Sequence, residues 1–237
     1  MKNIADNICT VRAQIARAAK VTGRKPQGIQ LLAVSKTRQA DELRQAFAAG
    51  QHAFGENYLQ EGLDKIEALA DLAIEWHFIG PIQSNKTRPI AEHFQWVHSV
   101  DRAKIARRLS EQRPPDMAPL NVCLQVNISA EESKSGCMPD DVLALARDVA
   151  QLPRLKLRGL MAIPAASQDP QHQQRAFAAM RTLLQQLQTE FPLLDTLSMG
   201  MSGDMDAAIA EGASIVRIGT AIFGTRNSNS NTQETPL

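Results

Sequence analysis

Lys36 is the residue whose position most directly suggests chemistry. It follows the apolar run LLAV at 31–34 and Ser35, and in a strand Leu32, Val34 and Lys36 would share one face. Burial favours the neutral, nucleophilic form of an amine, and such an amine can form a Schiff base with an aldehyde. A solvated lysine at a strand exit is the alternative interpretation, and position alone favours it.

Two segments near the carboxyl end of the chain are rich in small and hydroxyl residues. MGMSGD at 199–204 runs into a helical pattern and offers Ser202 and Gly203, while Gly219 and Thr220 follow an apolar run and begin another expected helix. Amides at helix N-termini bind phosphate well. Ordinary turn chemistry accounts for either segment alone, but the pair favours phosphate. With Lys36, they predict a site for a phosphorylated aldehyde.

Other polar residues lie within or just after apolar runs. Arg217 lies inside IVRI at 215–218, where a guanidinium is costly unless it has a partner, and a structural salt bridge is one explanation. Asn57 follows a short apolar run, and Met161 could pack against a planar ring or against the core. His77 is interpreted as a satisfied core histidine.

The spacing of apolar runs and helical patterns predicts the fold. Ile4, Ile8, Val11 and Ile15 recur at helical spacing, which predicts a leading helix over 4–19. Eight candidate strands alternate with helices, at 30–35, 52–55, 75–79, 95–99, 120–127, 156–163, 195–199 and 214–218.

This alternation is typical of the α/β class, and eight βα units in 237 residues predict a single (β/α)8 TIM barrel with an extra N-terminal helix. An open doubly wound sheet would normally carry a glycine-rich loop after its first strand, and SKTRQAD at 35–41 contains no glycine. We expect one domain over 1–226 and a disordered polar tail over 227–237.

Composition excludes several classes of function. The chain has 26 basic and 25 acidic residues, for a formal net charge of +1, so neither nucleic acid nor a membrane is an expected partner. Cys9, Cys123 and Cys137 lack the paired spacing of a metal or redox site, so we expect free thiols and no metal. Without a signal peptide or membrane span at its start, the chain is predicted to be cytoplasmic.

Several ordered motifs together resemble one family. They are LLAVSK at 31–36, FGENY at 54–58, WHFIGPIQSNK at 76–86, NISAEESKSG at 127–136, RGLMAIP at 158–164, SMGMSGDMDAAI at 198–209 and VRIGTAIFG at 216–224. The chain resembles the pyridoxal phosphate homeostasis proteins, also called proline synthase co-transcribed homologues, over nearly its whole length. A set of motifs in order is far more specific than any one of them.

The resemblance implies a barrel related to the N-terminal domain of alanine racemase, with pyridoxal 5′-phosphate held as an imine on Lys36. It places the phosphate at Ser202, Gly219 and Thr220, and Arg217 opposite the pyridine nitrogen. Asn57 and Met161 would flank the cofactor. Arginine can only donate hydrogen bonds, so the ring nitrogen would stay unprotonated and be a weaker electron sink.

The resemblance also implies a role in buffering, storing or delivering the cofactor in the cell, with no dedicated catalytic residue. Recipient partners would be apo-enzymes that depend on pyridoxal phosphate, and the protein would be a monomer. A pyridoxal phosphate-dependent amino-acid racemase is the alternative, and weak activity of that type stays open, with Tyr58 the candidate second base. A lysine-dependent aldolase is a more remote third interpretation. Lys134, in the loop after the fifth strand, is given little functional weight.

Overall fold

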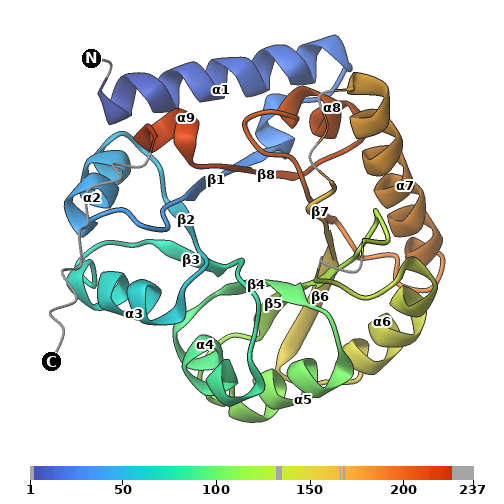
Figure 1. Cartoon of the computed structure of the whole chain (residues 1–237). Helices are drawn as coiled ribbons and strands as arrows, with labels where there is room; N and C mark the ends of the chain where they lie inside the picture. The colour runs from blue at the N-terminus through green and yellow to red at the C-terminus, as the bar shows by residue number, and fades with distance from the viewer. Residues whose placement is uncertain (1–2, 132–134, 166, 168, 226–237) are drawn as a thin grey trace, which may run out of the picture.

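The computed structural model describes residues 3–131, 135–165, 167 and 169–225. Eight parallel strands follow one another around a closed barrel, and β1 pairs with β8 to complete it (Figure 1). The strands are β1 (Gln30–Val34), β2 (Ala53–Glu56), β3 (Glu75–Phe78), β4 (Trp96–Val100), β5 (Leu120–Gln125), β6 (Leu155–Met161), β7 (Thr196–Ser198) and β8 (Ile215–Ile218). The predicted TIM barrel is confirmed, with every strand close to its predicted place.

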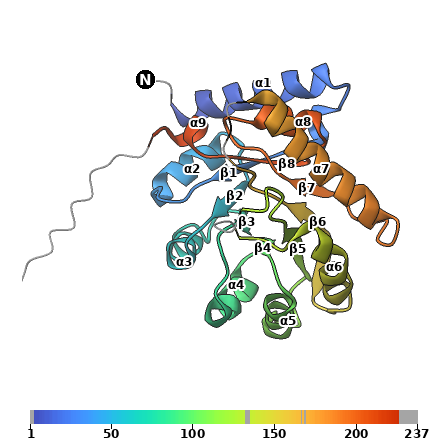
Figure 2. The ribbon, with the colours of Figure 1, turned by 45° about the vertical axis from the view of Figure 1, so that its right-hand side comes forward.

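The helices form a ring around the barrel (Figures 1 and 2). They are α1 (Ile4–Val21), α2 (Ala40–Ala48), α3 (Leu59–Ala68), α4 (Thr87–His93), α5 (Ala103–Gln112), α6 (Val142–Ala150), α7 (Pro170–Gln188), α8 (Met205–Ala210) and α9 (Thr220–Phe223). Short 3-10 turns lie at Pro26–Gly28, Ser84–Lys86 and Pro139–Asp141.

The predicted extra helix is α1, which precedes the first strand. The Asn3 side chain begins it by accepting a hydrogen bond from the Asp6 amide at 2.8 Å. Its apolar stripe, which includes Ile8, Val11 and Ile15, is buried, and the helix packs across α8 and α9 (Figure 2). Burying each of these side chains contributes about 1.5–3 kcal/mol, so α1 is an integral part of the layer of helices around the barrel.

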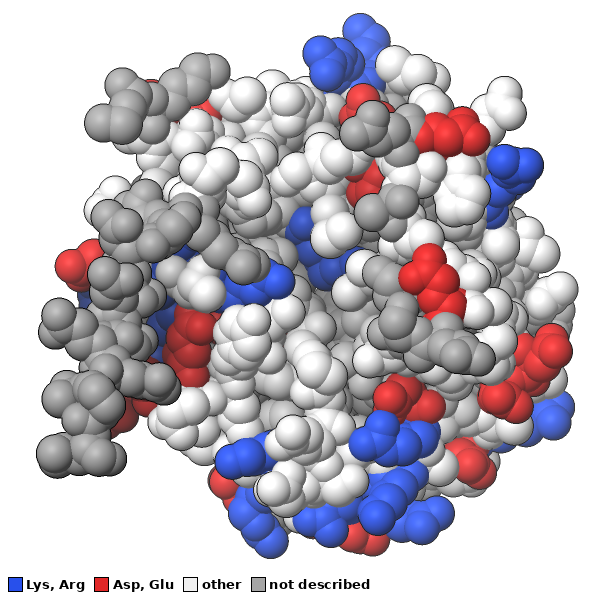
Figure 3. Space-filling view, in the orientation of Figure 1, with Lys and Arg blue, Asp and Glu red and all other residues white. Residues whose placement is uncertain are grey.

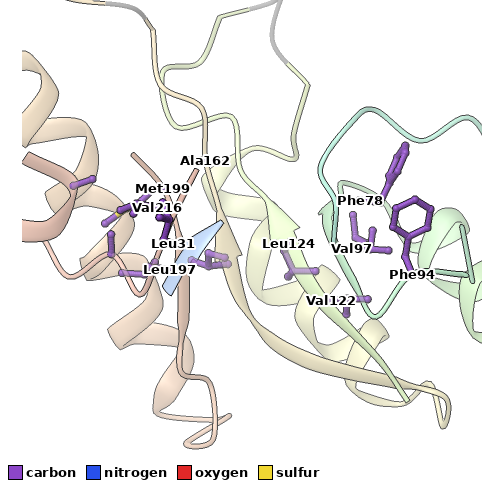
Figure 4. Packing of buried hydrophobic residues seen from close by; sticks show 14 of the residues in the cluster. Leu31, Phe78, Phe94, Val97, Val122, Leu124, Ala162, Leu197, Met199 and Val216 are labelled. Atoms are coloured by element: carbon purple, nitrogen blue, oxygen red, sulfur yellow. The ribbon is translucent and has the colours of Figure 1, made fainter. Parts of the chain in front are cut away.

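The strands divide their side chains between two apolar clusters because neighbouring residues point to opposite faces. Leu31 lies in the large cluster between the barrel and its helices, together with Phe78, Val97 and Val216 (Figure 4). Leu32 lies in a smaller cluster inside the barrel. Its members are Leu32, Ala53, Ile79, Trp96, Cys123, Met161 and Ile215, with Val34 packed against them. The interior is therefore a packed core rather than a pore.

Three sequence-based expectations concern other parts of the chain. Cys9, Cys123 and Cys137 are free thiols, as predicted. Among the described helices, none combines the length and apolar character that crossing a membrane requires. Lys134 and the predicted tail at 227–237 lie outside the described residues.

Candidate functional site

Lys36 lies in the turn that follows β1. Leu32 and Val34, which precede it on the same strand face, belong to the interior cluster, so the predicted inward-facing row is present up to the end of the strand. Lys36 itself is half-buried rather than enclosed. Lys36 therefore lies at the carboxyl edge of the barrel and is partly open to solvent.

The buried side chains of Lys65 and Glu56 fix Ser35, the residue before Lys36. The Lys65 ammonium, on α3, donates to the Ser35 carbonyl oxygen at 2.7 Å and to Glu56 Oε1 at 2.9 Å. The Ser35 hydroxyl donates to the same carboxylate oxygen at 2.5 Å. These contacts tie the end of β1 to β2 and to α3.

The residue after Lys36 is held from the same side. The Thr37 amide donates to a carboxylate oxygen of Glu61, which also accepts from Lys65 Nζ at 2.6 Å. Thr37 has φ of 62°, an uncommon conformation for a β-branched residue. We call Ser35, Glu56, Glu61 and Lys65 the turn clamp, because together they fix the backbone on both sides of the lysine.

The turn clamp was not anticipated from the sequence. Glu56 is fully buried, and its Oε2 contacts no hydrogen-bond donor among the described residues. Burial raises the pKa of this carboxyl, and the neighbouring Lys65 charge opposes that rise. A usable signal existed, since Lys65 lies between Gly62 and Leu69 on the helix face that turns inward.

Arg217 is buried in β8 and has two hydrogen-bond partners among the described residues. Its Nη1 donates to the Ser198 hydroxyl at 2.8 Å, and its Nη2 donates to the Ala162 carbonyl at 2.9 Å. The expected partner is therefore present, but the salt-bridge explanation is wrong, since no ion pair among the described residues includes Arg217. Burial lowers the pKa of Arg217 to about 10, which leaves it cationic at neutral pH.

Strand pairing brings the ends of β6, β7, β8 and β1 together. Leu32 pairs with Arg217, and a Cβ placed on Gly219 would lie 3.1 Å from the Val34 carbonyl oxygen. Met161 ends β6 inside the barrel, one residue before the carbonyl that Arg217 contacts. Lys36 and Arg217 thus come from neighbouring strands, as the sequence-based site requires.

The two predicted phosphate segments lie on neighbouring loops. Ser202 and Gly203 are exposed in the turn after β7, and the Met201 amide caps that turn by donating to Asp204 Oδ1 at 2.6 Å. Thr220 is exposed and begins α9, as predicted. Both loops therefore present hydroxyl groups to solvent at the carboxyl edge of the barrel.

Asn57 is half-buried in the bend after β2. The next loop passes so close to it that a Cβ on Gly80 would lie 2.0 Å from the Asn57 carbonyl oxygen. Only glycine fits there without displacing one of the two loops. Ser99 holds the same glycine by donating to its carbonyl at 2.5 Å.

His77 is a satisfied interior histidine, as predicted, although its partners are unusual. Its ring stacks on Trp96 with centroids 5.4 Å apart, and its two nitrogens contact Glu75 and His98. His98 was missed from the sequence. Like Arg217, it is a polar residue inside an apolar run, WVHSV, and the same reasoning would have identified it.

Charge on this side of the molecule is unevenly distributed. In Figure 3, Lys or Arg atoms lie close to the barrel axis amid uncharged surface, while most other charged side chains lie near the periphery. Within the described part of the chain, His, Cys, Asp and Glu side chains form no group suited to holding a metal ion. The arrangement combines a half-buried amine, a buried cation and exposed hydroxyl groups, which suits a small anionic molecule with a carbonyl group.

Fold and site together define a barrel of the alanine racemase type. Residues 7–227 match the family described as alanine racemase, N-terminal domain. Within it, the chain belongs to the pyridoxal phosphate homeostasis protein family. It is 63% identical to the pyridoxal phosphate homeostasis protein of Pseudomonas aeruginosa, over 96% of this chain and 97% of that protein. It is 54% identical to the Escherichia coli protein of the same name, over 96% and 98% respectively.

Solved structures show the same fold. The Synechococcus elongatus protein PipY, whose structure was solved with pyridoxal phosphate bound, is 40% identical and superimposes with a TM-score of 0.77 over 89% of this chain and all of that one. Alanine racemase from Corynebacterium glutamicum is 18% identical, with a TM-score of 0.69 over 91% of this chain and 61% of the racemase. That second likeness concerns the fold alone.

Proposed function

We propose that this chain binds pyridoxal 5′-phosphate and acts in its homeostasis, by buffering, storing or delivering it, rather than as a dedicated catalyst. Relatives that match along nearly the whole chain are named for this role, and PipY binds the cofactor. The observation that carries the proposal is the pairing of β1 with β8, which brings Lys36 and Arg217 to neighbouring strand ends.

The donor set fits this cofactor. When bound, pyridoxal phosphate supplies an aldehyde carbon and a phosphate. In our proposal the Lys36 amine is the nucleophile toward that aldehyde. Arg217 lacks an acceptor and remains charged at neutral pH, so it can face a ring nitrogen only as a donor.

The remaining proposed contacts follow the loops around the barrel edge. We assign the phosphate to Ser202, Gly219 and Thr220, where exposed hydroxyl groups and backbone amides can donate to it. Asn57 and Met161 would lie against the ring. The half-buried position of Lys36 suits exchange of the cofactor with incoming amines better than a closed site would.

The cellular setting extends the same proposal. We propose a cytoplasmic monomer that passes the cofactor to apo-enzymes requiring it. Sedimentation of the purified protein would test the monomer. Transfer would be tested by mixing the loaded protein with an apo-enzyme and following the recipient's activity.

The direct test is borohydride reduction after incubation with pyridoxal phosphate, followed by peptide mass spectrometry. We expect one reduced adduct, at Lys36, and none in the Lys36→Ala variant. The Lys20→Ala variant, which alters an exposed lysine of α1, should label like the wild type. Scattered labelling of surface lysines, or none at Lys36, would refute the attachment site.

The racemase alternative makes a different prediction. Racemisation needs a second proton donor on the opposite face of the substrate, and Tyr58, the candidate for it, is 54% exposed. Solvent deuterium incorporated at the α-carbon of amino acids at enzymatic rates would favour that alternative over the carrier.

A further inference from the structure

A chain of five hydrogen-bonded side chains runs through the inside of the barrel. Arg217 Nη1 lies 2.8 Å from Ser198 Oγ, which lies 2.7 Å from His98 Nδ1. His98 Nε2 lies 2.9 Å from His77 Nδ1, and His77 Nε2 lies 2.8 Å from Glu75 Oε1. The residues come from β8, β7, β4 and β3. The bond between Ser198 and His98 joins β7 to β4, which are not neighbours in the barrel.

The two ends of this chain differ in their surroundings. Ser198, His77 and His98 are completely buried and Arg217 is 3% exposed, whereas the Glu75 side chain is 42% exposed. Glu75 begins β3, at the amino edge of the barrel, and Arg217 lies near the carboxyl end of β8. The chain therefore joins a partly solvated carboxylate to a buried cation beside the proposed site.

Hydrogen-bond chemistry allows the direction of every proton to be worked out. An ionised carboxylate only accepts, so His77 donates to Glu75 from Nε2, and a neutral His77 then accepts at Nδ1. His98 must donate to it from Nε2 and accept at its own Nδ1. The Ser198 hydroxyl therefore donates to His98 and accepts from Arg217, which can only donate.

The opposite assignment leaves a buried group without a partner. If His98 donated from Nδ1, the Ser198 hydroxyl proton would have no acceptor among the described residues, since only His98 and Arg217 contact that oxygen. A buried donor without an acceptor is costly. Burial lowers the pKa of both His77 and His98, which agrees with two neutral rings. Gln30 adds a donor to Glu75 Oε1 at 2.9 Å.

We propose that Ser198 and His98 are positioning residues for Arg217, and that Glu75, through His77, sets the direction of the whole chain. Each proton then points from Arg217 toward Glu75. Arg217 is held by Ser198 and by the Ala162 carbonyl, so the rest of its guanidinium has a fixed orientation. The consequence for the cofactor rests on the proposed function. The ring nitrogen would face a donor of fixed orientation, Arg217, and the side chains behind Arg217 have no further proton to transfer, because each already donates toward Glu75.

The first test uses the protein without cofactor. Two-bond ¹⁵N–¹H correlation spectra of the apo-protein at pH 7 should show His77 and His98 as neutral rings protonated at Nε2. Either ring protonated at Nδ1, or at both nitrogens, would overturn the assigned direction. This result does not depend on pyridoxal phosphate. The test can therefore refute the assigned hydrogen-bond direction without bearing on the proposed function.

The second test removes the link next to Arg217. Ser198→Ala should weaken pyridoxal phosphate binding about tenfold, the loss expected for one charge-assisted hydrogen bond, and should shift the absorption band of the bound cofactor. Ser110→Ala, at another buried serine in α5, is the matched control and should change neither. Unchanged affinity and spectrum in a folded Ser198→Ala protein would overturn the positioning role.

The third test uses Glu75→Ala and does not require Ser198→Ala to fold. Glu75→Ala alters a partly exposed residue and removes the acceptor that orients His77. In the apo-protein we expect the Nδ1-protonated form to become populated on both histidines. If both remain fully protonated at Nε2, Glu75 does not set the direction.

Discussion

Lys65 and Glu56 form an ion pair behind the turn that carries Lys36, with Nζ 2.9 Å from Oε1 and side-chain exposures of 6% and 0%. Glu56 Oε2 contacts no donor among the described residues, so the Lys65 ammonium is the main compensation for burying this carboxylate. Removing one partner of a buried pair leaves an uncompensated charge, which is strongly destabilising.

The Lys65→Met variant should therefore lower the free energy of unfolding by about 3 kcal/mol, measured by urea denaturation at pH 7. Lys20→Met, at an exposed position of α1, is the control and should stay within about 0.5 kcal/mol of the wild type. Adding Glu56→Gln to Lys65→Met should restore part of the loss, because the buried charge is then gone. Equal effects at Lys65 and Lys20 would contradict this account of the turn clamp.

The close contact between Gly80 and the Asn57 carbonyl predicts a second sensitive position. Gly80→Ala places a methyl group 2.0 Å from that oxygen, so one loop must move. We expect a loss of about 1–3 kcal/mol in the free energy of unfolding, and weaker pyridoxal phosphate binding if Asn57 contacts the cofactor.

Gly28→Ala is the matched control for that change. A Cβ at Gly28 would meet nothing within 4 Å, so this variant should keep wild-type stability and binding. If Gly80→Ala were as stable as Gly28→Ala, the two loops would have to be far more adaptable than their contact suggests.

The fold could be predicted from the sequence because each strand or helix is marked by a local pattern of apolar residues. The run LLAV at 31–34 and the spacing of Ile8, Val11 and Ile15 each mark one element, and β1 and α1 formed where those patterns predicted. Arg217 shows the limit. Its apolar surroundings indicated a partner, but Ser198 and Ala162 are 19 and 55 residues away, and only barrel closure brings them to it.

The turn clamp shows the same limit more sharply. Glu61 and Lys65 have the spacing of an ordinary solvated pair on a helix, and that spacing alone does not distinguish them from one. Their burial against Glu56 depends on how α3 packs on β1 and β2. The cofactor contacts assigned to Asn57, Ser202, Gly219 and Thr220 remain predictions, because they depend on a ligand that sequence patterns do not position.

Glu75 should make stability depend on acidity. Its hydrogen bond from His77 lowers the pKa of this carboxyl from 4.5 to about 2, so the folded state favours the ionised form. The resulting stabilisation is present above pH 4.5 and is lost as the pH falls toward 2. Because the side chain is 42% exposed, we expect Glu75→Gln to cost only about 1 kcal/mol at pH 7.

Urea unfolding at pH 7, 4 and 3 would measure this effect. The difference between wild type and Glu75→Gln should shrink at the lower pH values, while Glu67→Gln, at an exposed position of α3, should differ little from wild type throughout. A difference that stays constant with pH would show that the Glu75 charge is not what stabilises the fold.

The three cysteines should differ in reactivity. Cys9 is exposed, whereas burial raises the pKa of Cys123 to about 12 and that of Cys137 to about 11. At pH 8 the thiols of buried Cys123 and half-buried Cys137 would be ionised to about one part in a thousand or less. An aromatic disulfide reagent should modify one thiol quickly in the folded protein and all three in urea. Cys9→Ser should remove the fast phase, and a fast phase that survives in this variant would mean that Cys123 or Cys137 reacts quickly despite its raised pKa.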